Sequence, residues 1–203
     1  MNKDILWRII TLQIVMIVVF TFGAGLAYFA ASFTNEQIKN QLAPQMITFP
    51  KDVEPTITEI NAKYPDLAVY ADGLRRYQGQ QVLNGDQANV FANAYLGVHV
   101  RDIDNGKPYS VLSSEARAEK DPALKAEKDA KVQTAFRGET LRSMLNQAWA
   151  FSVFGNVAFW AAIGLTVVAL VVGAALVYEL FFAHKPVDLE EAVRTGKLAT
   201  VKA

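Results

Sequence analysis

Two long stretches without a charged side chain restrict what this chain can fold into more than any other feature of its sequence. Residues 9–33 form the first stretch and residues 143–178 form the second. Each is longer than the roughly 20 residues that an α-helix needs to cross a hydrocarbon layer of ~30 Å. The sequence therefore predicts two transmembrane helices, over residues 9–33 and 143–178.

The first stretch has one competing interpretation, a cleaved signal peptide. Lys3 and Arg8 form a basic leader, and residues 30–32 are small enough for cleavage. The apolar stretch is about twice as long as the 7–15 residues of a usual signal core, however. We therefore expect an uncleaved membrane anchor.

Two spans place both termini on one side of the membrane. The short flank 1–8 carries Lys3 and Arg8 against Asp4, and short flanks decide orientation through their basic residues. Four basic residues between 128 and 142 would lie on the outer side of the second span, and they argue against this orientation. We expect a plasma-membrane protein with cytoplasmic ends at 1–8 and 179–203 and an extracytoplasmic domain at 34–142.

The composition excludes two further classes of protein, disordered chains and nucleic-acid-binding proteins. Hydrophobic residues make up 52% of the 203 residues, and 20 basic residues balance 20 acidic ones. Neither disorder nor nucleic-acid binding fits, because disorder needs few apolar groups and nucleic-acid binding needs a basic surface. The chain contains no cysteine, so packing rather than disulfides must hold the outer domain together.

The outer domain is expected to be mainly helical. Asn84 followed by Gln87 is typical of a capping box, and apolar residues then recur at helical spacing as far as Asp102. The sequence "DNG" at 104–106 predicts a turn that ends this helix. A second apolar pattern predicts a short helix over residues 67–77, and a third helix is expected at 56–64. Four prolines between residues 42 and 65 favour an extended loop around residues 46–50.

The second span is expected to continue a long helix of the outer domain. Asp121 and Pro122 are typical of a helix start. From there helical spacing is kept through Leu141, Leu145 and Trp149 into the apolar stretch. Gly138 is the weak point, because glycine costs about 1 kcal/mol relative to alanine in a helix, and a bend there is the alternative. The fold class predicted is thus an all-α membrane protein with two transmembrane helices flanking a helical extracytoplasmic domain.

Small residues on both spans predict close helix packing. They recur every four residues on one face of each span, and such faces let helices approach closely in lipid. Chance is the alternative explanation, because alanine and glycine are common in such helices. Together with the apolar stripe that leads into the second span, the candidate helix-packing or interface residues are Gly23, Ala27, Ala31, Leu141, Leu145, Trp149, Ala158 and Ala162.

No set of residues predicts catalysis or a cofactor. His99, Asp102 and Asp104 have one-turn spacing that suits a metal, but His99 is the only histidine of the outer domain. The sequence contains no phosphate loop, dinucleotide fingerprint or nucleophile elbow. The tail 179–203 is too short for a signalling domain, and Asp188 with Glu191 predicts one or two helical turns in it. We therefore expect a protein that is not an enzyme and carries no cofactor or metal.

One family resemblance covers most of the chain. The segments "ITFP", "YQGQQVLNGDQANVFANAYLGVHV", "GKPYSVLSSEAR" and "QTAFRGETLRSMLNQAWAFSVFG", placed between two apolar spans, resemble a group of actinobacterial two-span membrane proteins of unknown function. Some members have a name that refers to ring-opening dioxygenases, which implies an iron site of histidines and a carboxylate. His99 and His184 alone do not supply that site, so the activity is not expected here. The resemblance implies an actinobacterial plasma-membrane protein with an outward-facing domain.

Two functions remain as expectations. The preferred one is a non-catalytic structural or accessory protein in the lipid bilayer, a homo-oligomer or a subunit of a larger membrane protein complex. The alternative is a domain that binds or senses an envelope lipid or solute through the aromatic-rich helices around Tyr70, Tyr77, Phe91 and Tyr95. Aromatic residues at helical spacing more often form a core, and nothing predicts a nucleic-acid partner.

Overall fold

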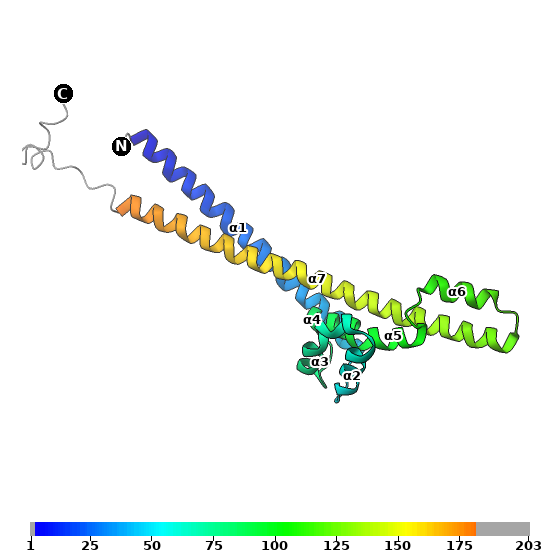
Figure 1. Ribbon diagram of the computed structural model, residues 1–203. Helices are drawn as coiled ribbons and strands as arrows, with labels where there is room; N and C mark the ends of the chain where they lie inside the picture. Colours follow the sequence, from blue (N-terminus) through cyan, green and yellow to red (C-terminus); the bar gives the residue numbers. More distant parts are fainter. Residues whose placement is uncertain (1–2, 182–203) are drawn as a thin grey trace, which may run out of the picture. The chain divides into compact units, whose positions relative to one another are not determined.

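The structure is a computed structural model that describes residues 3–181, and these residues form an all-helical protein (Figure 1). They contain no β-strand, and their β pairing is an isolated antiparallel bridge between Thr48 and Gln81. The all-α part of the predicted fold class is therefore confirmed. The expected short helix at Asp188 and Glu191 lies outside the described residues.

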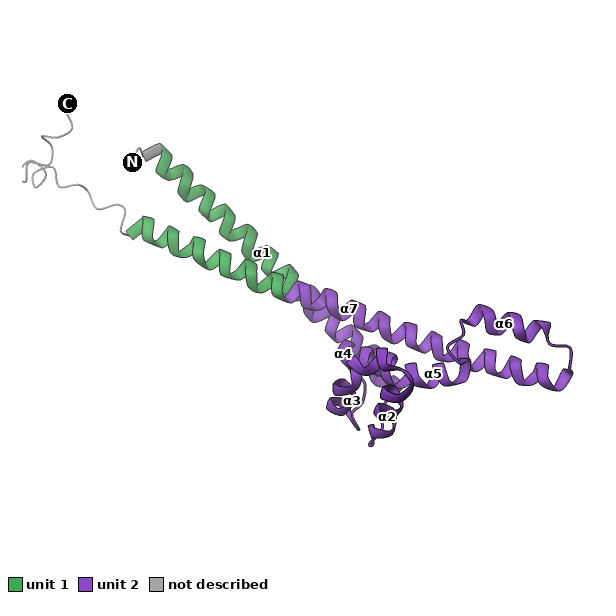
Figure 2. Cartoon of the chain, viewed as in Figure 1, with its two compact units in different colours: residues 1–28, 160–203 green, residues 29–159 purple. Residues whose placement is uncertain are grey.

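The chain divides into two compact units (Figure 2). The first comprises residues 1–28 and 160–203, and the second comprises residues 29–159. Two long helices, α1 (Lys3–Leu42) and α7 (Pro122–Phe181), contribute residues to both units. The small helices all belong to the second unit.

Both long helices are long and apolar enough to cross a membrane. Only 6% of the most apolar window of each helix is buried, whereas the core helix of a soluble protein would be mostly buried. Large apolar side chains such as Phe22 and Leu170 are exposed on these helices, which is compatible with lipid contact. Within the first unit the two helices approach closely: a Cβ atom on Gly23 would lie 3.4 Å from Leu165 Cδ1.

Helix α7 is continuous through Gly138, as the kept helical spacing predicts. Its start is also as predicted, because Asp121 Oδ1 accepts the backbone N–H groups of Ala123 (2.8 Å) and Leu124 (3.0 Å). Gly138 marks a close contact and not a bend. A Cβ atom there would lie 2.5 Å from Cγ2 of Val100, which is buried.

Short helices connect α1 to α7. In chain order they are η1 (Ala43–Gln45), α2 (Glu54–Lys63), η2 (Pro65–Tyr70), α3 (Ala71–Tyr77), α4 (Gly85–Val90), η3 (Phe91–Tyr95), α5 (Leu96–Asp104) and α6 (Tyr109–Ala118). The helix predicted at 56–64 corresponds to α2. The helix predicted at 67–77 is split into a 3-10 turn followed by α3, and the one predicted at 84–102 contains a π-helical turn, η3, in its middle.

The predicted cap at Asn84 is present. Asn84 Oδ1 accepts the backbone N–H of Gln87 at 2.9 Å, and Gln87 Oε1 accepts the backbone N–H of Leu83 at 2.8 Å. A regular capping box would return this second bond to residue 84. The predicted turn after α5 is also present, with Asn105 and Gly106 at φ values of 52° and 72°.

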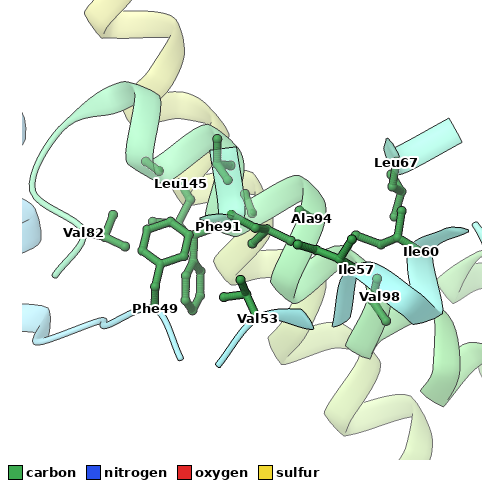
Figure 3. Close-up of a cluster of buried hydrophobic side chains, with 14 of the residues drawn as sticks. Phe49, Val53, Ile57, Ile60, Leu67, Val82, Phe91, Ala94, Val98 and Leu145 are labelled. Atoms are coloured by element: carbon green, nitrogen blue, oxygen red, sulfur yellow. The ribbon is translucent and has the colours of Figure 1, made fainter. Parts of the chain in front are cut away.

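The core of the second unit lies where α2, α4 and η3 meet the end of α1 and the middle of α7 (Figure 3). Phe49 from the loop at 46–50 is buried in this cluster, with its ring centre 5.2 Å from that of Phe91 in an edge-to-face arrangement. Leu145 of α7 is 1% exposed and completes the cluster. The small helices are therefore built onto both long helices, because neither set buries enough apolar surface alone.

Candidate functional site

An apolar groove of about 690 Å³ lies between α1 and α7 in the second unit. Ile38, Leu42 and Leu145 form its floor and are themselves buried. Large apolar side chains surround its opening and remain exposed: Phe33, Leu141, Met144 and Phe151. The volume falls within the ~300–1,000 Å³ of small-molecule pockets, and we call this site the α1–α7 groove.

One wall of the α1–α7 groove carries a row of carboxamides. Gln37 and Gln41 lie one turn apart on the same side of α1, and Gln45 of η1 lines the groove with them. Gln147 adds a fourth carboxamide from α7. Within residues 3–181 these side chains make no hydrogen bond to protein, and no charged residue lines the groove.

A second candidate surface is the hairpin formed by α6 and the first turns of α7. Lys125 Nζ donates to the carbonyl of Ala116 at 3.1 Å, and Lys128 pairs with Glu119 at 2.6 Å. This pairing lowers the pKa of Glu119 and raises that of Lys128. The hairpin is thus held by polar contacts near its tip and by a thin apolar interior.

An exposed aromatic pair lies at the other end of this hairpin. The rings of Tyr109 and Phe136 are 5.6 Å apart and are 47% and 51% exposed. Both residues lie outside the charge-free stretches, so lipid contact does not account for their exposure. Exposed apolar groups surrounded by polar ones are typical of interaction surfaces.

The three residues with metal-like spacing are not brought together. Asp102 accepts a hydrogen bond from Tyr64 Oη at 2.8 Å and pairs with Lys63, whereas His99 Nδ1 lies 2.8 Å from the carbonyl of Tyr95. Burial opposes the charged form of Asp102, but the bond from Tyr64 and the charge of Lys63 outweigh it and lower its pKa. No group of three or more potential ligands exists among the described residues.

Asp104 has a structural role. Its Oδ1 accepts the backbone N–H of Gly106 at 2.7 Å, which holds the turn after α5. Burial raises the pKa of this carboxyl despite that bond, and Glu139 adds to the effect. Glu139 itself pairs with Arg142 at 2.8 Å, as expected for residues one helical turn apart.

The aromatic residues of the ligand-binding alternative belong to the core. Phe91 is buried, and Tyr70, Tyr77 and Tyr95 are half-buried against the same cluster. Tyr77 donates a hydrogen bond to Asp86, and its burial raises its pKa. These residues do not line the α1–α7 groove.

The predicted packing residues divide into two groups. Ala31, Leu145 and Ala162 are buried by the chain itself, and Gly23, Ala27 and Ala158 are half-buried. Leu141 and Trp149 are exposed and remain open to a partner. Their role in contacts with another protein stays a prediction.

Sequence reasoning missed both candidate surfaces. The row of glutamines at 37, 41 and 45 is a readable signal, because four-residue spacing directly after an apolar span predicts a polar stripe at its edge. The contact between Tyr109 and Phe136 carries no local signal, since it depends on α6 folding back onto α7.

No protein-family model matches this chain, and no curated protein or solved structure matches it either. The resemblance to actinobacterial two-span proteins therefore stays a prediction.

Proposed function

We propose that this protein is a non-catalytic accessory protein of the plasma membrane, held by two spans, whose outer domain docks onto a larger membrane complex. The exposed pair of Tyr109 and Phe136 carries this proposal. Burying two aromatic side chains against a partner is favourable, at roughly 25 cal/mol for each Å² of apolar surface. Aromatic residues are also enriched at protein interfaces.

The polar surroundings of this pair support docking over nonspecific adhesion. Lys107, two residues before Tyr109, pairs with Glu115 at 2.7 Å. A polar rim around an apolar centre is the usual anatomy of an interface. The predicted orientation, with cytoplasmic ends and residues 34–142 outside, would present this hairpin to extracytoplasmic partners.

Self-association is the other form of the same function. Leu141 and Trp149 are exposed on α7 and could contact a second copy. Ala158 and Ala162 are poor positions for testing this, because Ala162 is buried by its own chain. A larger side chain there would disturb packing inside the protein as well.

Native mass spectrometry after mild detergent extraction tests the proposal. We expect the tagged protein to carry foreign subunits in stoichiometric amounts and to lose them when Phe136 is replaced by glutamine. Glu127→Gln is the matched control, since it changes an exposed residue of the same helix, and it should retain the partner. A defined multiple of 22.4 kDa without foreign subunits would favour self-association. A monomer without partners would contradict both forms.

A further inference from the structure

We propose that the α1–α7 groove binds one hydrocarbon chain of a membrane amphiphile whose head group is uncharged and rich in hydroxyl groups. This site is separate from the exposed pair of Tyr109 and Phe136, because neither residue lines it, and it shares only Leu141 with the surface named for self-association. The inference therefore does not depend on the proposed docking function.

The floor and opening of the groove favour an apolar occupant. Leu42 and Leu145 lie at its base, and Phe33, Met144 and Phe151 stand exposed around it, with Met144 62% exposed. An apolar chain lying between these side chains would cover surface that nothing in residues 3–181 covers. The gain is roughly 25 cal/mol per Å² removed from water.

The size of the groove suits one hydrocarbon chain. The groove follows about three turns of chain, from Phe33 to Gln45. Its volume of about 690 Å³ lies within the ~300–1,000 Å³ of small-molecule sites.

The carboxamide row specifies the head group. Gln37, Gln41 and Gln45 each offer two donor hydrogens and an accepting oxygen, the combination that hydroxyl groups can satisfy. A phosphate group would instead be met by arginine or lysine. Neither lines the groove, and the nearby guanidinium of Arg142 is held by Glu139 and by the carbonyl of Ala92.

The position of the groove along the chain explains how such a ligand would enter. Phe33 ends the first charge-free stretch, and the second stretch begins two residues after Leu141. With both stretches in a bilayer, the groove lies where hydrocarbon meets the head-group layer. An amphiphile could slide in from the adjacent leaflet without leaving the membrane.

Photolabelling of the full-length protein in phosphatidylcholine vesicles tests the inference. The probe is a monoacylglycerol with a diazirine near the end of its chain, and labelled residues are identified by mass spectrometry. We expect several-fold more label on Met144 and Phe151 than on Phe154, which is exposed on α7 but does not line the groove. The same probe chain on phosphatidic acid should give several-fold less label at these residues.

Two tryptophan substitutions provide the matched comparison. Met144→Trp fills the groove and should reduce labelling of Phe33 and Phe151 several-fold, whereas Phe154→Trp should leave it unchanged. Gln41→Leu keeps the groove apolar and should reduce the preference for the monoacylglycerol over phosphatidic acid. All three variants must elute from a size-exclusion column as the parent protein does, so that misfolding is recognised.

Three results would overturn the inference. Equal labelling of Phe151 and Phe154 that Met144→Trp does not change would mean ordinary contact with bulk lipid. Equal labelling by the phosphatidic acid probe would refute the uncharged head group. Crosslinks between two copies, formed from a photoreactive methionine analogue at position 144, would show that protein fills the groove.

Discussion

Two glycine residues of the second unit mark places where helices touch. Gly138 faces Val100 on α5, and Gly85 at the start of α4 lies directly against Ser152 of α7. In both cases a Cβ atom would overlap a neighbour, so the small residue permits the contact. The same residue that weakens an isolated helix therefore strengthens the packed one.

Gly138→Ala should destabilise the protein although alanine is the better helix former. The gain in propensity is about 1 kcal/mol, and overpacking a stiff buried valine costs about 1–3 kcal/mol. We expect a net loss on the order of 1 kcal/mol, measured by thermal unfolding in detergent.

The sign of this effect should reverse when Val100 is first replaced by alanine, because the overlapping methyl group is then absent. Gly164→Ala is the control, since a Cβ atom there has open space in the same helix, and it should not destabilise. A stabilising Gly138→Ala in the unmodified protein would contradict the contact.

Asp66 should make part of the stability depend on pH. It accepts two hydrogen bonds from Arg101, at 2.9 and 2.8 Å, and this lowers the pKa of Asp66 from its ordinary value of 3.8. Stability from this pair is therefore complete above 3.8 and is lost as the pH falls through the lower folded-state pKa.

Asp66→Asn should reduce stability slightly at neutral pH, and the difference from the parent should vanish in acid, as followed by thermal unfolding across a pH series. Asp72→Asn makes the same charge change at a highly exposed carboxylate and serves as control. A difference that grows towards low pH would refute the pair's role.

Three residues of helix α7 hold the other elements of the second unit in place. Leu145 enters the core, Gly138 receives Val100, and Asn146 meets Asn93 of η3. Asn93 Nδ2 donates to Asn146 Oδ1 at 2.8 Å and to Asn89 Oδ1 at 2.7 Å. This carboxamide chain fixes the register of η3 against α7.

Replacing both Asn93 and Asn146 should destabilise the protein less than the sum of the two single replacements. Asn93→Leu leaves the half-buried Asn146 without its partner, which costs about 1–3 kcal/mol. Asn146→Leu removes the partner of Asn93 at a similar cost. The double variant removes both polar groups, so we expect a coupling energy of about 1 kcal/mol in a cycle of unfolding measurements. Additive losses would show that the two amides do not interact.

The whole molecule combines two apolar helices with one helical domain inserted between them in the sequence. Both ends of the described chain belong to the apolar unit, and residues 29–159 form the other. Two spans with an intervening domain put that domain on a single side of the membrane.

The predicted side can be tested with single cysteines, because the chain has none of its own. Ser114→Cys, exposed on α6, should react with a membrane-impermeant maleimide in intact cells. Asn2→Cys should react only after the membrane is opened. The reverse pattern would place residues 34–142 in the cytoplasm and remove the basis for extracytoplasmic docking.

Features that depend on neighbouring residues in the chain were readable in advance. The two apolar helices, the caps at Asn84 and Asp121 and the turn at Asn105 all follow from local pattern. Their physical causes act over a few residues, through backbone hydrogen bonds and the cost of burying polar groups in lipid.

Tertiary structure alone decided how the helices meet. From the sequence, Gly138 is a weak point of its helix, and the aromatic residues suit a core better than a ligand surface without excluding the latter. The structure places Val100 against Gly138 and packs Phe49 among the aromatic residues. The α1–α7 groove depends on residues more than 100 positions apart, Phe33 and Leu141 among them. Such contacts arise from shape and volume in three dimensions, which hydrophobic periodicity along the chain does not encode.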